Sequence, residues 1–442
     1  MKKFFAALIV AALVLSAVFA LVACTPTDDG EKSAVELAIE AAQKMTLEEL
    51  EAASKKEFED NPDAKFNADS LTSGVQKALK AFAKKYEWLS YDNTHDDKVE
   101  EADKVTGNVF YNSKKGSEYQ PKLSAAAEAN QYIADFVMIQ DAAFVDSLVK
   151  DKFLLSYVPS GDEFNIADSD KEPLVGVTFN KVFMWNSKDG RENQLTNVWQ
   201  LTGADGANGK KGVKNVSFQS PLGEDINMSF LIMLTGEDAV AKLTPAYKAY
   251  FGSDYDGSKD DYINIGYKFA AEFIKNVAYW HSSDSDQIKG INGGYAKADA
   301  SDGRIVFAGL CKLKDAACYK AEETDENYYK KIVKGAGWNQ DVEGFPGFVY
   351  NMWTLIPKTA KLPYTASLFV RYLLTEEGFN AGFGDILGYY SSNQKISSVP
   401  GDPALSVWKQ KAIVEDVEYI NSVYKTVVKF VNQQLSSNSK FK

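Results

Sequence analysis

Short apolar segments alternate with amphipathic helical patterns in the first third of the chain, and this rhythm limits the fold more than any other feature. Residues 65–69 and 133–139 are strand-like, and residues 75–86 and 143–150 follow them with apolar side chains at helical spacing. Strands that alternate with helices in this way predict a largely parallel sheet. Because 442 residues exceed what one domain normally holds, we expect an α/β protein with two lobes.

The rest of the chain continues this pattern. Residues 173–185 are rich in strand-forming side chains and are expected to cross into the second lobe, and residues 348–358 contain another long strand. The sequence Thr46-Leu-Glu-Glu49 predicts a capping box at the second N-terminal helix. Helical patterns occur at 34–58, 123–130, 226–234, 239–251, 263–277, 364–374 and 408–435.

The N-terminus has the features of an exported chain. Two lysines precede an apolar run over residues 4–23, and the small residue Ala23 stands directly before Cys24. This ending resembles the bacterial lipobox, in which the cysteine thiol accepts a diacylglyceryl group. The alternative is a membrane-spanning anchor, because about 20 apolar residues can cross a bilayer. We expect residues 1–23 to be a lipoprotein signal peptide, Cys24 to be lipidated, and the rest of the chain to lie outside the cytoplasm.

The remaining cysteines, Cys311 and Cys318, are expected to form a local disulfide, because disulfides persist in oxidising extracytoplasmic compartments. The sequence has no CxxC motif and only two histidines, which is too few for a typical zinc cluster. We therefore expect no metal and no cofactor.

The charge distribution argues against a nucleic-acid partner. The formal net charge is −12, and the only arginines are Arg191, Arg304 and Arg371. Nucleic-acid binding usually needs a basic face with arginine forks. An acidic chain of this kind suits neutral or cationic small ligands better.

Several motifs stand in one order along the chain: ALKAFAKKY at 78–86, IADFVMIQDA at 133–142, FLLSYVP at 153–159, VSFQSP at 216–221, and a strand, an Ile-Pro-Lys turn and a helix over 348–379. In this order the chain resembles the extracellular solute-binding proteins of bacterial ABC importers. The closer resemblance is to the type II branch, which includes iron-, polyamine-, thiamine- and sugar-binding members. The resemblance spans about residues 66–390.

This resemblance implies two α/β lobes, joined by crossing strands, that close over a ligand. We expect residues 24–62 to form the tether and N-terminal helices, 63–174 with 345–380 the first lobe, and 175–344 with 381–442 the second. Ligands of parallel sheets bind beyond the carboxyl ends of the strands, and tryptophans can stack on a solute. The cleft candidates are therefore Ser70, Thr72, Ser73, Gln140, Asp141, Gln219, Ser220, Trp185, Trp280 and Trp353.

Ferric-binding members of the branch hold iron with a tyrosine pair. Tyr328-Tyr329 and Tyr389-Tyr390 are such pairs here, but neither stands in the sequence context of the family. The resemblance therefore gives only weak support for iron.

The expected function is that of a solute-binding lipoprotein that takes a sugar, a polyamine or another cation and delivers it to a permease on separate chains. We expect a monomer that is bound to the membrane only through its lipid. A surface lipoprotein that binds host or partner proteins is the alternative, and it should expose an apolar patch. A secreted carbohydrate-active enzyme comes third, since the sequence has neither GxSxG nor HExxH, and no enzymatic activity is expected.

Overall fold

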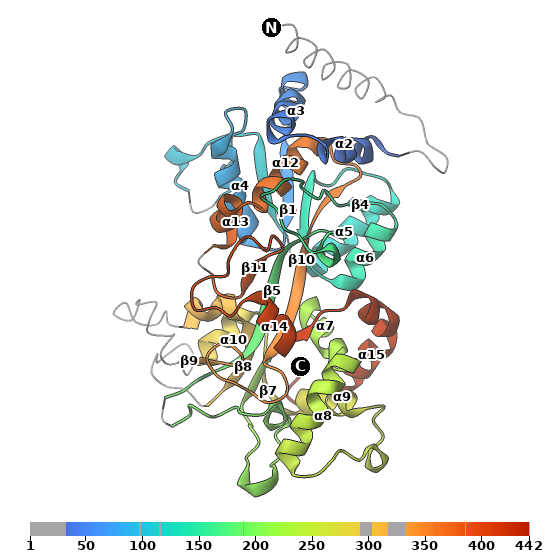
Figure 1. The fold of residues 1–442 in the computed structure, drawn as a ribbon, viewed down its shortest axis with the longest axis vertical. Coiled ribbons are helices and arrows are strands. Elements are labelled where there is room, and N and C mark those ends of the chain that lie inside the picture. Colours follow the sequence, from blue (N-terminus) through green and yellow to red (C-terminus); the bar gives the residue numbers. More distant parts are fainter. Residues whose placement is uncertain are drawn as a thin grey trace.

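The computed structural model describes residues 32–96, 99–114, 116–188, 190–291, 303–316, 333–384 and 386–441. These residues form two α/β lobes, which lie one above the other in Figure 1. The two-lobed fold predicted from the sequence is confirmed. Within the described ranges, no helix is both long enough and apolar enough to span a membrane.

The first lobe is built on three parallel strands. β1 (Phe66–Ser70) lies between β2 (Val109–Ser113) and β3 (Phe136–Ile139). The helices of this lobe are α4 (Ser73–Lys85), α5 (Gly116–Glu128), α6 (Ala142–Lys150), α12 (Pro363–Leu373) and α13 (Glu376–Phe383), and the N-terminal helices α2 (Ala34–Ala42) and α3 (Leu47–Asp60) pack on α12 at the top of Figure 1.

The second lobe repeats this plan. β6 (Val216–Gln219) lies between β7 (Val277–His281) and β8 (Ile305–Gly309), and all three strands are parallel. Its core is a cluster of phenylalanine rings from these strands, the neighbouring helices and β5, including Phe183, Phe218, Phe230, Phe273 and Phe307. The helices of this lobe are α7 (Asp225–Met233), α8 (Glu237–Phe251), α9 (Ile265–Asn276), α10 (Asp284–Ile291) and the long C-terminal α15 (Val417–Ser437).

Two long strands belong to both lobes. β5 (Val175–Asn186) and β10 (Gly347–Pro357) pair antiparallel from Val175–Trp353 to Val182–Gly347. The upper end of β10 pairs with β3 of the first lobe, and the lower end of β5 pairs with β8 of the second. The order β2-β1-β3-β10-β5-β8-β6-β7 therefore runs through the whole molecule. The expectation that residues 173–185 cross between lobes is confirmed.

Shorter elements complete the chain. The strands β4 (Leu154–Leu155) and β12 (Ile413–Val414) pair with β10, and β9 (Val333–Gly335) and β11 (Tyr389–Ser391) pair with β5. The 3-10 turns are η1 (Glu101–Asp103), η2 (Asp168–Asp170), η3 (Val198–Thr202), η4 (Ala207–Gly209), η5 (Gly257–Lys259) and η6 (Leu310–Ala316), and one further short helix is α14 (Leu405–Lys411).

Local chemistry explains where several elements begin and end. The predicted capping box is present, because Thr46 Oγ1 accepts from the Glu49 amide at 3.2 Å and Glu49 Oε2 accepts from the Thr46 amide at 2.9 Å. The strand expected over 133–139 is shorter than predicted. Asp135 instead turns its buried carboxylate to the amides of Lys361 and Leu362, which lie 2.7 and 3.1 Å from Oδ1. The helix expected near 123–130 also starts earlier, at Gly116.

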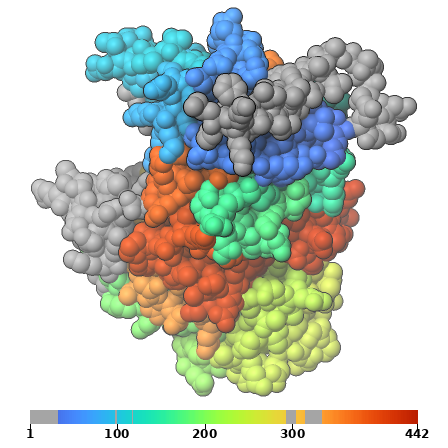
Figure 2. Space-filling model, turned by 45° about the horizontal axis from the view of Figure 1, so that its top comes forward, coloured from blue at the N-terminus to red at the C-terminus, as the bar shows by residue number. Residues whose placement is uncertain are grey.

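The C-terminal helix α15 contacts both lobes. It packs on α7 and α9 of the second lobe and on α6 of the first, where the Asn421 amide donates to Asp146 Oδ2 at 2.7 Å. Figure 2 shows the orange and red C-terminal residues between the blue first lobe and the yellow-green second lobe. The end of the chain therefore holds the two lobes together on one side.

Gly347→Ala should destabilise the crossing strands. A Cβ at this position would overlap the Lys181 carbonyl oxygen on β5, so the ladder must shift, and we expect a loss of about 2 kcal/mol. The urea midpoint of unfolding measures this loss. Gly223→Ala is the matched control, since its Cβ would lie 3.9 Å from the nearest atom. Equal midpoints for both variants would contradict the close approach of β5 and β10 described here.

Candidate ligand-binding cleft

The carboxyl ends of six strands meet at the junction between the lobes. β1, β2 and β3 run down toward the junction, and β6, β7 and β8 run up toward it, because β5 and β10 reverse the direction between the two sets. The loops after these ends carry the polar side chains that parallel sheets use for ligands.

Hydrogen bonds join the lobes at this junction. Gln140, which follows β3, donates across the junction from Nε2 to Glu224 Oε1 at 2.9 Å, and within the second lobe Gln219, which ends β6, donates to Glu224 Oε2 at 3.3 Å. Gln120 of α5 donates from Nε2 to Asp225 Oδ2 at 3.0 Å and to Asp141 Oδ2 at 2.8 Å. The structure thus brings together three predicted residues, Gln140, Asp141 and Gln219, with Gln120, Glu224 and Asp225, which sequence reasoning missed.

The other predicted loop residues have local roles. The buried Ser70 Oγ accepts from the Thr72 amide at 3.1 Å, and Thr72 Oγ1 accepts from the Gly74 amide at 3.3 Å as the N-cap of α4. Ser73 is exposed in the first turn of α4. Ser220 Oγ accepts from the Leu222 amide at 3.3 Å in the turn after β6. These residues shape the loops of the junction without bonding across it.

The three tryptophans do not form a stacking surface in this structure. Trp185 is fully buried and donates to the Arg191 carbonyl, and Trp353 is 2 % exposed in β10. Trp280 is half-buried between Phe218 and Phe441, whose ring centroids lie 6.1 and 4.7 Å away. The expectation that they stack on a solute is therefore corrected: each of them packs against the protein itself.

A single lysine lies in the apolar strand β5. Lys181 is 2 % exposed, and its Nζ lies 3.1 Å from Asp284 Oδ1 at the start of α10 and 3.0 Å from Asn227 Oδ1 of α7. A charge can be buried when it is paired and hydrogen-bonded in this way. Lys181 therefore anchors the first turns of two helices under the junction. A charged residue in a strand that is buried along its whole length is the signal that could have identified it.

Aromatic rings from β5, β10, β11 and α13 pack together at the junction. Phe179 of β5 stacks on Tyr389 with centroids 4.5 Å apart and meets Tyr350 of β10 edge-on at 5.5 Å. Phe383 of α13 packs against Tyr389 at 5.6 Å. Burial raises the pKa of the Tyr350 phenol, and Cys311, Asp284 and Glu224 add to this shift. The junction therefore combines aromatic rings on β5 and β10 with acidic side chains in the loops.

Burial raises the pKa of the junction carboxyls. It raises the pKa of Asp225 to about 6, helped by the neighbouring Asp141 charge, and the pKa values of Asp141 and Glu224 also rise. Glu415, which follows β12, is buried with a pKa raised to about 8. Its Oε2 accepts from the Asn351 amide at 3.1 Å, while Oε1 has no partner.

Several solved structures share the fold of this chain. Iron-bound HitA from Pseudomonas aeruginosa matches 84 % of this chain and 99 % of its own, with a TM-score of 0.52 and 13 % identity. The PBP AgtB from Agrobacterium tumefaciens, in complex with agropinic acid, gives 0.50 and 15 %, and an ABC transporter from Clostridium perfringens gives 0.51 and 14 %, each over 84 % of this chain and 99 % of the other. The chain has the periplasmic binding protein fold. No protein-family model and no curated protein match the sequence.

Several expectations concern residues that the structure does not describe. Cys24, Cys318 and Tyr328-Tyr329 lie outside the described residues, so lipidation and the disulfide with Cys311 stay predictions. Of the second tyrosine pair, Tyr390 is buried and donates to Asp402 Oδ1 at 2.7 Å. Among the described residues, no three His, Cys, Asp or Glu side chains come together as metal ligands.

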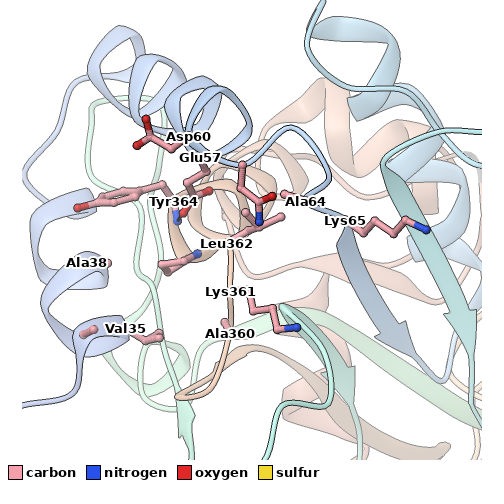
Figure 3. A pocket seen from close by; sticks show the side chains of 13 residues that line it. Val35, Ala38, Glu57, Asp60, Ala64, Lys65, Ala360, Lys361, Leu362 and Tyr364 are labelled. Atoms are coloured by element: carbon pink, nitrogen blue, oxygen red, sulfur yellow. Dashed lines mark hydrogen bonds between the residues drawn. The ribbon is translucent and has the colours of Figure 1, made fainter. Parts of the chain in front are cut away.

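A separate cavity lies at the far end of the first lobe, away from the cleft between the lobes. It has a volume of about 480 Å³ and lies between α2, the end of α3 and residues 360–364 (Figure 3). Glu57 on its wall accepts from the amides of Tyr364 and Thr365, both at 2.9 Å, and so caps α12. This cavity is mostly apolar, and the Glu57 carboxylate on its wall is already bonded to the first amides of α12.

Glu415→Gln should change how the stability depends on pH. The folded protein keeps a proton on Glu415 up to about pH 8, whereas the unfolded chain loses it near pH 4.5. The contribution of Glu415 is therefore complete below pH 4.5 and is lost as the pH rises through 8. Glutamine imitates the protonated side chain at every pH. We expect equal stability of the two proteins at low pH and a gain on the order of 3 kcal/mol for the variant above pH 8.

Urea midpoints at the two pH values measure this effect. Glu418→Gln is the control, because Glu418 is exposed at the start of α15 and its substitution should leave the pH dependence of the midpoint unchanged. A Glu415→Gln variant that tracks the wild type at both pH values would show that Glu415 is ionised in the folded protein.

Proposed function

We propose that this protein is the extracytoplasmic, lipid-anchored solute-binding component of an ABC importer. It captures a small solute between its lobes and delivers it to a permease on separate chains. The observation that supports this most directly is the junction itself. Polar strand ends from both lobes converge there and bond to one another through Gln120, Gln140, Glu224 and Asp225.

Hinge closure follows from the strand arrangement. The lobes are joined through the middle of the β5–β10 ladder, where Phe179 and Tyr350 pair in register. A rotation about this short segment would change the distance between Gln140 and Glu224, and α15, which packs on both lobes, would have to move on α6 at the same time. A solute that contacts both lobes binds the closed form more tightly, and this difference in affinity shifts the population toward closure.

The proposed solute is a sugar or a small cation such as a polyamine. Tyr389 at the junction is partly exposed, and an aromatic ring suits both the apolar face of a sugar ring and the charge of an ammonium group. The carboxylates in the junction loops disfavour an anion. Lys181 does not offset this preference, because its charge is already paired with Asp284.

The proposed anchor and lobe boundaries come from the sequence. Cys24 would carry several acyl chains, because one chain alone binds a membrane only marginally. The first lobe would comprise residues 63–174 with 345–380, and the second 175–344 with 381–442. The contacts of α12 and α13 with α4 support the placement of residues 363–380 in the first lobe.

A thermal-shift screen of the chain from residue 25 onward tests the proposed function. The panel holds sugars, polyamines, amino acids, thiamine, ferric compounds and phosphate. A true ligand at about 100 times its Kd should stabilise the protein by roughly 2.7 kcal/mol, which is a rise of a few degrees in Tm. Small-angle scattering of the same sample should then show a lower radius of gyration.

Two other results would point to different functions. A folded protein with no shift across the whole panel, but with specific capture of a host or partner protein, would indicate a surface-interaction lipoprotein. A sugar that is consumed during the assay would indicate a carbohydrate-active enzyme.

A further inference from the structure

A further cavity lies where β11 ends and α14 begins, two elements that Figure 1 labels near the middle of the molecule. Its volume is about 460 Å³, within the range of small-molecule sites. It is bounded by the end of β11, the loop after it, η2 and α14. The residues that bond across the junction, Gln120, Gln140, Glu224 and Asp225, do not line it. The cavity is therefore a different place from the cleft between the lobes.

The two tyrosines of β11 show that the cavity and the junction lie on opposite sides of this strand. Successive side chains of a strand point to opposite faces. Tyr389 stacks on Phe179 among the rings of the junction, whereas Tyr390 lines the cavity and donates to Asp402 Oδ1 at 2.7 Å. A solute in the cavity would thus contact the face of β11 that the cleft does not use.

We propose that this cavity is a second binding site, and that it takes a small neutral polyhydroxy compound such as a monosaccharide, a disaccharide or a sugar alcohol. The proposal adds a site to the protein and does not depend on which solute the cleft binds. Hydroxyl groups, one buried hydroxyl without a partner and one balanced pair of charges support it.

Hydroxyl groups dominate the polar part of the lining. They belong to five serines, which are Ser391, Ser392, Ser397, Ser398 and Ser406. A serine hydroxyl can donate one hydrogen bond and accept two, so it pairs with a sugar hydroxyl in either direction. Ile396 and Leu405 supply apolar contacts for the carbon atoms of such a compound. This mixture suits a polyol better than a purely apolar solute.

One of these hydroxyls is buried and unsatisfied. Ser392 is 2 % exposed, and its Oγ has no hydrogen-bond partner among the described residues. The neighbouring Ser391 differs, because its Oγ accepts from the Asn393 amide at 3.1 Å. A buried polar atom without a partner is costly and calls for an explanation. Since Ser392 lines the cavity, a hydroxyl of a bound solute can supply the missing bond.

The charges of the lining balance each other. Among the described residues that line the cavity, the charged side chains are Asp170 and Lys409, whose Oδ2 and Nζ lie 3.8 Å apart. This distance exceeds that of a direct hydrogen bond. A solute hydroxyl can therefore bond to either group, and such bonds are strengthened by the charge. Because the two charges cancel, the cavity favours a neutral solute over an anion or a cation.

Bonds outside the cavity hold its walls in place. On one side, Asn393 donates from Nδ2 to the Leu374 carbonyl at the end of α12, at 3.0 Å. On the other side, Trp338, which follows β9, donates from Nε1 to the Gly401 carbonyl at 3.0 Å. The loop after β11 and the segment before α14 are thus fixed to different parts of the protein. The site is preformed and does not need the solute to assemble it.

Isothermal titration calorimetry on the full chain tests the proposal, in a detergent without a sugar headgroup. The probes are glucose, maltose, trehalose and sorbitol, and we expect at least one of them to bind. Ser406→Trp should weaken this binding at least tenfold, because Ser406 is an exposed lining residue and the indole ring would fill the cavity. Val407→Trp is the matched control, since Val407 is exposed on the same helix but does not line the cavity.

Ser392→Ala tests the unsatisfied hydroxyl. The variant should bind the probe at least fivefold more weakly, yet it should melt no lower than the wild type, because no protein group loses a partner. Ser391→Ala is the comparison. It removes the acceptor of the Asn393 amide and should therefore melt lower than the wild type.

The outcomes separate the second site from the proposed function. A probe that binds the wild type, Ser406→Trp and Ser392→Ala with equal affinity would overturn the second site and leave binding in the cleft standing. The absence of binding by all four probes would also overturn the second site, whereas the proposed function is decided by the wider screen. A Ser392→Ala protein that melts several degrees lower than the wild type and keeps its affinity would show that this hydroxyl is structural, and it too would overturn the proposal.

Discussion

The backbone ladder between β5 and β10 is the constraint on which the rest of this structure depends. Among the described strands, this ladder joins the sheet of the first lobe, where β10 pairs with β3, to the sheet of the second, where β5 pairs with β8. Because these strands reverse the chain direction, the parallel strands of both lobes point their carboxyl ends at each other. The junction, its polar loops and its aromatic rings all follow from this single reversal.

Charge is distributed unevenly around that junction. On the side of the second lobe, the buried Lys181 is paired with Asp284 and bonded to Asn227, so this part of the junction is neutral and rigid. On the side where the lobes meet, Asp141, Asp225 and Glu415 have only neutral donors as partners. The same short region thus contains an ion pair, which supports the helices, and a group of acids whose pKa values are raised by burial.

The elements were more predictable than the site. Helical spacing and the capping box at Thr46 identified α3, and the strand-like run before Pro357 identified β10 to within one residue at each end. Gln140, Asp141 and Gln219 could be placed at the junction because a strand end has a local signature. The positions of Gln120, Asp225 and Glu415 there could not be predicted, because they arise from the approach of segments far apart in the sequence. The tryptophans misled for a related reason, since composition alone cannot distinguish a buried ring from one that faces a cleft.

Each lobe is built from segments that are far apart in the sequence, and this affects when the protein can fold during synthesis. β10 and α12, which complete the first lobe, are encoded some 200 residues after β3, and α15, which covers the second lobe, is almost the last segment of the chain. Neither hydrophobic core can close until nearly the whole polypeptide has been synthesised. A growing chain of this kind cannot bury its early strands, and it stays extended for as long as the C-terminal third is missing. For the proposed export, this delay would keep the chain unfolded until it has crossed the membrane.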